Sequence, residues 1–399
     1  MNREIDGEDG TDRAWEFEAK ALRSIKDINH PNITKCLAAI RRGRHRYFMF
    51  PWANGSSLRH YWDATEQQGP TERLVFQAVQ QLRGLADALH HLHCCVNTQA
   101  PEIPVPMGKE SATNESAPDL SDPVNAKNIR HGDLKPENIL RFLEDRDAGV
   151  GTLKIADMGL AKQHVLATQL RDKKTSMRYG TIRYEAPEAI AQSEKSRSRR
   201  YDIWSMGCIT LEFIIWILYG NHALKEFYRQ VEGDAKQSCQ YFEFPAQSNT
   251  PVIHHVVLRW MDHIRQDPEC SQDSAIRDLL NLVQDRLLVI SLGGGSMSLS
   301  PDQSTLDVAT PVVVTPGRAT AAQFCSALDE ILECPRPNYF FTGRERTNVM
   351  LPTKKMSHLS PKVHQPPRRN EGVPSRVDDY DALSQEIIPI HVRSDYAVS

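Results

Sequence analysis

The feature that most constrains this chain is a short polar segment with an apolar end, HGDLKPENIL at residues 131–140. Transfer of a phosphoryl group needs a carboxylate beside the attacking hydroxyl, a cation near the transferred group and an oxygen ligand for a metal ion. Asp133, Lys135 and Asn138 offer these three functions on one tight loop. The apolar pair Ile139-Leu140 directly after the loop suits a short strand.

A second acidic position lies downstream of this loop. Residues 153–156 (LKIA) predict a strand that delivers Asp157-Met158-Gly159, where a carboxylate followed closely by glycine can approach a phosphate bound to Mg²⁺. An isolated Asp-x-Gly is usually only a turn. Its position after the polar loop is what gives it weight.

Two further segments follow in the chain, GTIRYEAPE at 180–188 and DIWSMG at 202–207. With the first two they resemble the protein kinase family, because H-x-D-L-K-P-x-N, D-x-G, G-T-x-x-Y-x-A-P-E and D-x-W-S-x-G stand in family order at plausible spacing. The segment FPWANGSSLR at 50–59 also resembles the hinge between the lobes of a kinase group common in filamentous fungi.

The resemblance implies roles for individual residues. Asp133 would be the catalytic base, Lys135 the cation at the transferred phosphoryl group, and Thr181 the link between them. The implied cofactors are ATP and Mg²⁺, with Asn138 and Asp157 as the metal ligands. The implied nucleotide residues are the glutamate of the N-lobe helix, the bulky residue before the hinge, the hinge residue that binds adenine and the floor beneath the ring: Glu18, Phe50, Ala53 and Leu140.

Two of the implied roles are structural. Glu188 would form a buried ion pair with Arg318, and Asp202 would hold the backbone of the catalytic loop from a central helix. A lysine two places after the catalytic aspartate, together with Gly180-Thr181, is the pattern of the serine/threonine branch of the family. The resemblance therefore implies protein substrates with serine or threonine hydroxyls.

The implied fold class is α+β, a bilobal protein kinase fold with a truncated N-lobe and a mainly helical C-lobe. The seventeen residues ahead of Glu18 contain neither the glycine-rich loop of the family nor the lysine of its third strand. Three absent strands would leave residues 33–52 as a small sheet with an unpaired, partly apolar edge, which natural domains avoid. We therefore expect a truncated sequence rather than a true loss.

The chain divides into three parts on composition and on the resemblance. We expect an acidic leader at 1–14, a kinase domain at 15–335 and a disordered, Pro-rich tail at 336–399. The kinase domain would contain an N-lobe remnant, a C-lobe and two solvated insertions, at 15–53, 54–335, 97–127 and 293–317.

The periodicity of apolar residues predicts several elements. Residues 12–28 and 71–93 carry apolar side chains at three- and four-residue spacing, which is typical of amphipathic helices. Residues 33–40 and 46–52 predict two short strands. The most apolar stretch, residues 209–219, is far shorter than the roughly 20 residues of a membrane span, so we expect a buried helix.

Composition points to local rather than global recognition. The chain has 48 basic and 51 acidic residues and a formal charge of -3, so no overall field favours a nucleic acid or a membrane as partner. Its 8 cysteines have no C-x-x-C pair, and its N-terminus has no apolar core typical of a secretory signal. We expect an intracellular protein, in the cytoplasm or the nucleus, with an oligomeric state that the sequence does not define.

Three alternatives stay open from the sequence. A pseudokinase that only binds is the strongest, because an intact catalytic loop does not compensate for a missing nucleotide clamp. A small-molecule phosphotransferase of the same fold also begins its loop with His-Gly-Asp-Leu, but such enzymes usually lack the lysine and the 180–188 segment. The cluster HHLHCC at 90–95 invites a zinc site, although no second half with metal-site spacing accompanies it.

Overall fold

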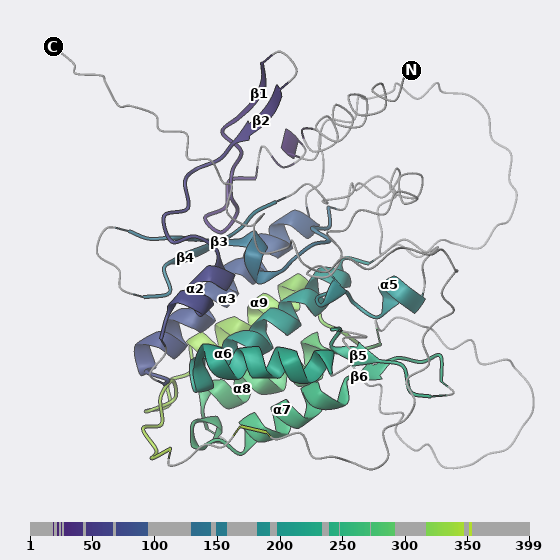
Figure 1. Ribbon diagram of the computed structural model, residues 1–399. Coiled ribbons are helices and arrows are strands. Elements are labelled where there is room, and N and C mark those ends of the chain that lie inside the picture. The colour runs from purple at the N-terminus through teal and green to yellow at the C-terminus, as the bar shows by residue number, and fades with distance from the viewer. Residues whose placement is uncertain are drawn as a thin grey trace, which may run out of the picture.

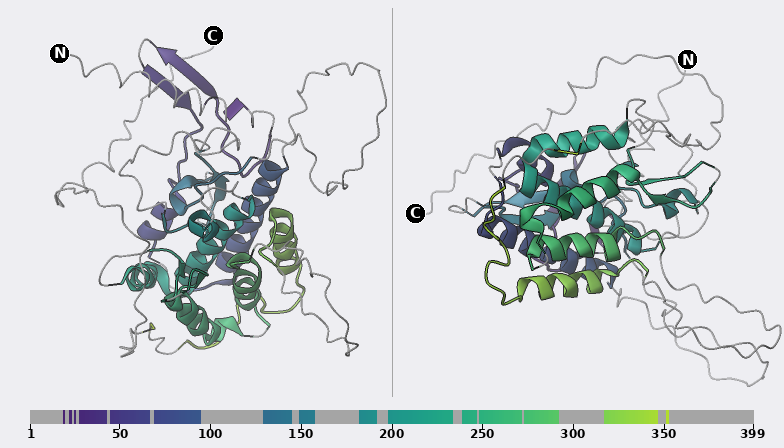
Figure 2. Two further views of the ribbon diagram at one scale, coloured as in Figure 1. Left: turned by 90° about the vertical axis from the view of Figure 1, so that its right-hand side faces the viewer. Right: turned by 90° about the horizontal axis from the view of Figure 1, so that it is seen from below.

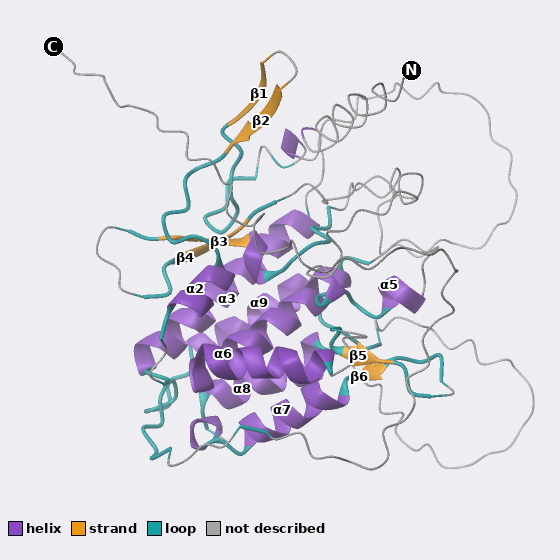
Figure 3. Cartoon of the chain, viewed as in Figure 1, coloured by secondary structure: helices purple, strands orange, loops and turns teal. Residues whose placement is uncertain are grey.

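The computed structural model describes residues 19, 22, 23, 25, 28–42, 45–66, 69–94, 129–144, 149–157, 182–191, 198–233, 239–246, 248–271, 273–291, 317–346 and 351–352. Helices make up the larger part of this region, and a two-stranded ribbon stands apart from them (Figures 1 and 3). The side view on the left of Figure 2 shows the same division. The described residues thus combine helix and sheet, in agreement with the predicted mixture of both.

One strand pair, a hairpin, precedes the long helix predicted at 71–93, and a second strand pair follows it. Strands β1 (Ala38–Arg42) and β2 (His45–Met49) are antiparallel, with Ala38 opposite Met49. Strands β3 (Ile139–Phe142) and β4 (Thr152–Ile155) are also antiparallel, with Ile139 opposite Ile155. The strand predicted after Asn138 and the strand predicted before Asp157 are therefore partners of each other.

The strand predicted from Ile33 begins five residues later than expected, at Ala38. The reason is that the preceding segment pairs with β4 instead, through an isolated parallel bridge between Ile33 and Ile155. Thr34 N–H donates to the Ile155 carbonyl at 2.8 Å, and Ile155 N–H donates to the Asn32 carbonyl at 2.8 Å. The segment thereby ties the hairpin side of the molecule to the strand pair of the catalytic loop.

Seven α-helices of the described residues form the body of the molecule: α2 (Leu58–Ala64), α3 (Glu72–His93), α5 (Glu188–Ala191), α6 (Arg200–Glu232), α7 (His255–Arg265), α8 (Ala275–Leu282) and α9 (Ala321–Leu332). Helix α3 confirms the helix predicted at 71–93: the Thr71 hydroxyl caps it by accepting from Leu74 N–H at 3.2 Å. Its apolar stripe is buried. Shorter elements are the 3₁₀ turns Pro136–Asn138 and Pro268–Cys270, the π turn Val283–Leu287, and the strands β5 (Phe242–Glu243) and β6 (Val252–Ile253).

Helix α6 is the central element of the core. It is long and apolar enough to cross a membrane, but 94% of its most apolar window is buried inside the protein, as in a core helix of a folded domain. It contains the buried helix predicted at 209–219 and extends beyond it on both sides. A kink at Gly220, with φ of 77°, separates its two halves, and glycine adopts this left-handed conformation at little cost.

The packed region extends past the predicted domain boundary at residue 335. Tyr339 is buried, and its hydroxyl donates to Asp278 at 2.6 Å. Arg346 forms a salt bridge with buried Asp267 at 2.8 Å. The first part of the predicted tail therefore packs against the helices, because it carries an aromatic residue that becomes buried and a cation whose partner, Asp267, is buried.

Candidate active site

Asp133, Lys135 and Asn138 lie together on the catalytic loop, as the sequence predicts. Lys135 Nζ lies 3.1 Å from Asp133 Oδ2, and the Asn138 amide nitrogen donates to the same oxygen at 3.1 Å. The same amide nitrogen also donates to the Asp133 carbonyl at 2.9 Å. These contacts fix the Oδ2 atom of the Asp133 carboxylate. The other oxygen, Oδ1, takes part in none of them.

His131 joins the catalytic loop to the residue before Asp157. Its Nδ1 accepts from Asp133 N–H at 3.3 Å, so in the neutral ring Nε2 carries the proton and donates to the Ala156 carbonyl at 2.9 Å. Ala156 N–H in turn donates to the Asn138 carbonyl at 2.9 Å. Asp157 follows directly, with φ of 59°, a left-handed conformation that aspartate tolerates better than most residues. The second acidic position is thus brought to the edge of the catalytic loop.

Asp202 holds the backbone of this loop from α6, as predicted. Its two carboxylate oxygens accept from His131 N–H and Gly132 N–H, both at 2.9 Å, and His93 Nε2 lies 2.9 Å from one of them. Burial of this carboxyl opposes its ionisation, yet the hydrogen bond to His93, the nearby imidazoles and the Gly132 amide together hold the pKa of Asp202 below its usual value. Gly132 has φ of 79°, so this position of the loop suits a glycine.

Asn138 and Asp157 are suitable ligands for a hard cation. The contacts of the Asn138 side chain to Asp133 use only its amide nitrogen, so its amide oxygen is not consumed by them. An amide oxygen and a carboxylate are the ligand types that Mg²⁺ prefers, and Mg²⁺ usually retains several waters besides. The donor set therefore fits the predicted metal.

The hinge segment runs beside the strand that carries Leu140. Gly55 N–H donates to the Arg141 carbonyl at 3.0 Å, and Arg141 N–H donates to the Ser56 carbonyl at 2.8 Å. A Cβ at Gly55 would lie 2.9 Å from the Arg141 carbonyl oxygen, so the close approach requires glycine. Ala53 and Leu140, both half-buried, are therefore held on neighbouring segments, as their predicted nucleotide roles require.

The remaining predicted positions differ in what the structure describes. Phe50 is half-buried and packs against the core. Glu18 and Thr181 lie outside the described residues, as do Met158 and Gly159. Their predicted roles stay predictions.

Glu188 and Arg318 form the predicted ion pair. The two guanidinium nitrogens Nη1 and Nη2 bind the two carboxylate oxygens at 2.7 Å and 3.0 Å. The Arg318 side chain is fully buried and also donates to the carbonyls of Val289 and Arg200, each at 2.9 Å. The pair anchors the segment after residue 180 to the segment that follows the second insertion.

A cluster around Arg59, buried or half-buried except for Glu137, was not predicted from the sequence. Arg59 Nε lies 3.0 Å from the carboxylate of Glu137 in the catalytic loop, and its two other nitrogens donate to Tyr228 Oη at 2.6 Å and Tyr184 Oη at 2.8 Å. Glu212, fully buried on α6, lies 3.5 Å from Arg59 and accepts from Tyr184. We call these five residues the Arg59 cluster. It joins the helix after the hinge, the catalytic loop and the segment around Tyr184.

Replacement of Arg59 by alanine is expected to destabilise the protein in a pH-dependent way. Burial raises the pKa of Glu212, and Arg59 opposes this effect, so the substitution raises the Glu212 pKa further. At neutral pH we expect a loss of about 2–3 kcal/mol in the free energy of unfolding, less than for a fully buried pair because two tyrosine hydroxyls still bind Glu212.

The sign of the pH dependence follows from the raised pKa. A carboxyl whose pKa is higher in the folded than in the unfolded state binds its proton more readily when folded, so its cost is largest above the folded pKa and declines as pH falls. Urea unfolding should be measured at several pH values. The difference in the free energy of unfolding between wild type and Arg59→Ala should become smaller as the pH falls. Between Glu212→Gln and Arg59→Ala/Glu212→Gln the difference in unfolding free energy should not change with pH, because neither variant carries the titrating carboxyl. A gap of constant size in the single variant would contradict the assignment to Glu212.

The histidine-rich end of α3 does not converge on a metal in the described residues. His93 binds Asp202, whereas His91 Nδ1 lies 2.9 Å from the Asp87 carbonyl, and His90 Nδ1 lies 3.5 Å from Cys94 Sγ. Each histidine thus has a different partner, and Cys95 is outside the described residues.

Two other groups of side chains are close enough to hold a cation, His30 with Asp87 and His91, and Glu243 with His254 and His255. In both groups one histidine is committed to another role. His30 Nδ1 accepts from Asn32 N–H at 3.1 Å, and His254 Nδ1 accepts from Val256 N–H at 3.2 Å. The neutral ring then carries its proton on Nε2, the atom that faces the carboxylate. Hydrogen bonding accounts for both groups without a metal.

Comparison with known proteins agrees with this geometry. Residues 124–285, from just before the catalytic loop into the π turn that follows α8, match the family model described as protein kinase domain. The chain is similar to the serine/threonine-protein kinase MPS1 of Encephalitozoon cuniculi, with 29% identity over 40% of this chain and 24% of that protein. It is also similar to the serine/threonine-protein kinase ICK of Mus musculus, with 28% identity over 50% of this chain and 24% of that protein.

A third relative is the putative mitogen-activated protein kinase kinase kinase 7-like protein of Drosophila melanogaster, with 27% identity over 49% of this chain and 38% of that protein. The matched part thus spans well under half the length of these curated relatives. Residues 124–285 contain the catalytic loop and Asp202 with its two backbone donors. Residues 124–285 thus match a protein kinase domain, and the chain is similar to eukaryotic serine/threonine protein kinases at 28–29% identity.

Proposed function

We propose that the chain is a serine/threonine protein kinase that transfers the γ-phosphoryl group of ATP to hydroxyl groups of protein substrates. The observation that supports this proposal is the grouping of Asp133, Lys135 and Asn138 on one loop, tied through His131 to the residue before Asp157. The serine/threonine kinases among the relatives favour the same substrate class.

In this proposal each residue of the loop has a separate task. Asp133 accepts the hydrogen bond of the substrate hydroxyl and takes up its proton as the new oxygen–phosphorus bond forms, while the bond from the γ-phosphorus to the β,γ-bridging oxygen breaks and ADP leaves. Lys135, 3.1 Å from Asp133, lies where it would offset negative charge on the transferred group. Asp202 keeps the loop backbone in place through the two N–H groups that it binds. A bound Mg²⁺, held by Asn138 and Asp157, would supply positive charge at the phosphates.

The direct test is phosphoryl transfer by the purified full chain. We expect incorporation of phosphate from labelled ATP and Mg²⁺ into serine or threonine of a mixed peptide library, and a fall of about 10²-fold or more for Asp133→Asn, because the amide cannot take up the proton. Arg229→Ala, on the exposed side of α6, is the control that should keep the wild-type rate. Equal rates for Asp133→Asn and wild type would contradict the role of Asp133.

A second candidate is a nucleotide-independent binding module of the same fold. The observation that favours it is the low identity, 27–29%, between this chain and the kinases that it resembles. The two candidates differ in nucleotide affinity, so the thermal midpoint should be followed with and without Mg·ATP. A rise that Asp157→Ala abolishes favours the kinase, and an unchanged midpoint favours the binding module.

A further inference from the structure

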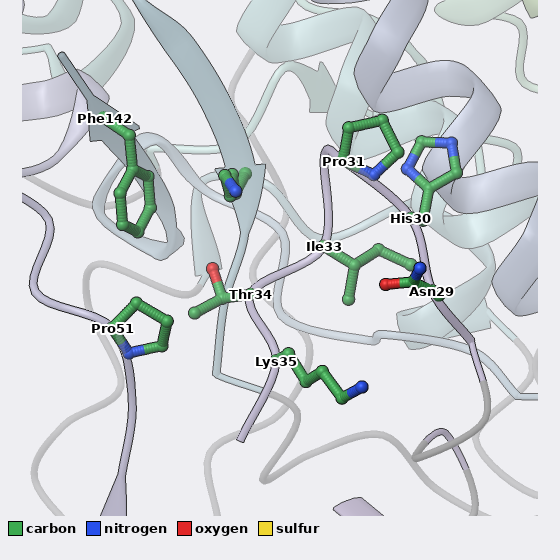
Figure 4. Close-up of a pocket in the computed structure, with 9 residues that line it drawn as sticks. Asn29, His30, Pro31, Ile33, Thr34, Lys35, Pro51 and Phe142 are labelled. Carbon is green, nitrogen blue, oxygen red and sulfur yellow. The ribbon is translucent and has the colours of Figure 1, made fainter. Parts of the chain in front are cut away.

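A cavity of about 330 Å³ lies behind the hinge, between three segments of the chain. Its walls include Thr34 and Lys35 ahead of β1, Pro51 at the hinge, and Phe142 and Lys154 on the β3–β4 pair. Figure 4 shows Thr34 with Phe142 and Pro51 on one side and Ile33 and Pro31 on the other. The cavity volume is at the lower end of the range for small-molecule sites.

The charge of the cavity wall is positive. Lys35 and Lys154 both line it, and none of its lining residues is an aspartate or a glutamate. The Lys154 ammonium lies 4.8 Å from the centre of the Phe142 ring, a cation–π contact that defines its position. Among the described residues, no carboxylate forms a salt bridge with either lysine. The half-buried Lys154 and the exposed Lys35 thus place positive charge at one cavity, with no salt-bridge partner among the described residues.

Thr34 supplies an independent polar group at the same cavity. It is 3% exposed, and its hydroxyl has no hydrogen-bond partner in the described part of the chain. A buried hydroxyl without a partner costs about 1–3 kcal/mol, so such groups in folded proteins call for an explanation. The backbone of Thr34 is fixed by its bond to Ile155. A ligand oxygen that reaches the Thr34 hydroxyl would give it a partner.

We propose that this cavity is a binding site for a small organic anion, one carboxylate or phosphate group on a compact apolar body. The lysines would bind the anionic group, and the ring of Phe142 with Pro51 and Ile33 would contact the apolar body. At the ~30 Å³ that a water molecule occupies in the liquid, the cavity has room for about ten non-hydrogen atoms. This limits the ligand to a metabolite-sized molecule.

The location of the cavity connects it to the predicted nucleotide-binding and metal-binding residues. Pro51 lies two residues before Ala53, and Lys154 lies three residues before Asp157. A ligand that bridges these walls therefore contacts both the hinge and the strand that positions the second acidic residue. Occupation of the cavity is a means to couple an anionic metabolite to the geometry of the active site.

The test uses benzoate, an anion of matching size, with the isosteric neutral molecule benzamide as its counterpart. We expect benzoate to raise the thermal midpoint of the full chain in a saturable way and benzamide to have no such effect. In Lys154→Gln, which keeps the length of the side chain but not its charge, the apparent benzoate affinity should fall at least about tenfold, a loss of about 1.4 kcal/mol. Lys225→Gln, an exposed lysine beside Asp63, should bind benzoate as wild type does.

Thr34→Val separates binding from stability. Removal of a buried hydroxyl that has no partner should leave the midpoint of the free protein unchanged or raise it, while benzoate binds more weakly. Absence of a saturable benzoate effect, equal effects of benzoate and benzamide, or an unchanged affinity in Lys154→Gln would each overturn the site. None of these readouts depends on phosphoryl transfer, so they are independent of the proposed kinase activity.

Discussion

Arg318→Ala should lower the free energy of unfolding by about 3–5 kcal/mol, which is a large share of the stability of an ordinary domain. The substitution leaves the buried carboxylate of Glu188 without its two-point partner. It also removes the donor for the carbonyls of Val289 and Arg200, which lie on segments far apart in the sequence. Urea unfolding of the purified variant at neutral pH measures the loss directly.

The double variant Glu188→Gln/Arg318→Ala tests whether the loss comes from an unpaired charge. Because the amide costs less to bury than a carboxylate, the double variant should be more stable than Arg318→Ala alone. An exposed pair gives the matched control: Arg229 lies 2.7 Å from Glu226 with 60% of its side chain exposed, and Arg229→Ala should cost at most about 1 kcal/mol. Similar losses for Arg318→Ala and Arg229→Ala would contradict the structural role of the buried pair.

The sequence predicted those parts of the site that short motifs carry. Asp202 and its contacts to the catalytic loop could be placed because the segment DIWSMG fixes both the residue and its helix. Helix α3 could be bounded at 71–93 because an apolar stripe and a capping threonine agree there. In both cases several local signals point to the same structure, which is why the predictions held.

The Arg59 cluster was missed for the opposite reason. Arg59 and Tyr228 are 169 residues apart, and nothing in the local pattern of either indicates the other. The choice of partner is made only when α2 and the second half of α6 pack together. A glutamate inside the catalytic loop, Glu137, was the one available signal, because a carboxylate at that place needs a cation nearby or full exposure to water.

The predicted start of the tail after residue 335 rested on composition, and the packed region extends past it. Residues after Pro335 are rich in proline and polar side chains, a pattern typical of disorder. Two of them nevertheless join the packed region, since the buried Tyr339 donates to Asp278 and Arg346 binds the buried Asp267. Average composition describes whether a segment can build a core of its own, whereas packing against an existing core needs only a few matching side chains.

Removal of residues 336–399 should therefore unfold the protein or make it insoluble. The truncation leaves two buried carboxylates with fewer partners: Asp267 loses the guanidinium of Arg346, and Glu269 loses the N–H groups of Thr342 and Gly343, at 2.8 Å and 3.1 Å. Each loss of a partner to a buried charge costs about 3–5 kcal/mol, so the sum approaches the total stability of a domain. Soluble yield and the unfolding transition of the 1–335 fragment measure the effect.

A fragment that ends at residue 352 is the matched control, because it keeps every described residue of this segment, including the Pro352 carbonyl that accepts from Gln230 at 2.8 Å. We expect it to unfold at the same urea concentration as the full chain. The stability of Arg346→Ala in the full chain should lie between those of the two fragments. This substitution removes a partner from Asp267 only, and the N–H donors to Glu269 remain. If the 1–335 fragment were as stable as the 1–352 fragment, residues 336–352 would contribute no stability. The helices alone would then stabilise the buried carboxylates.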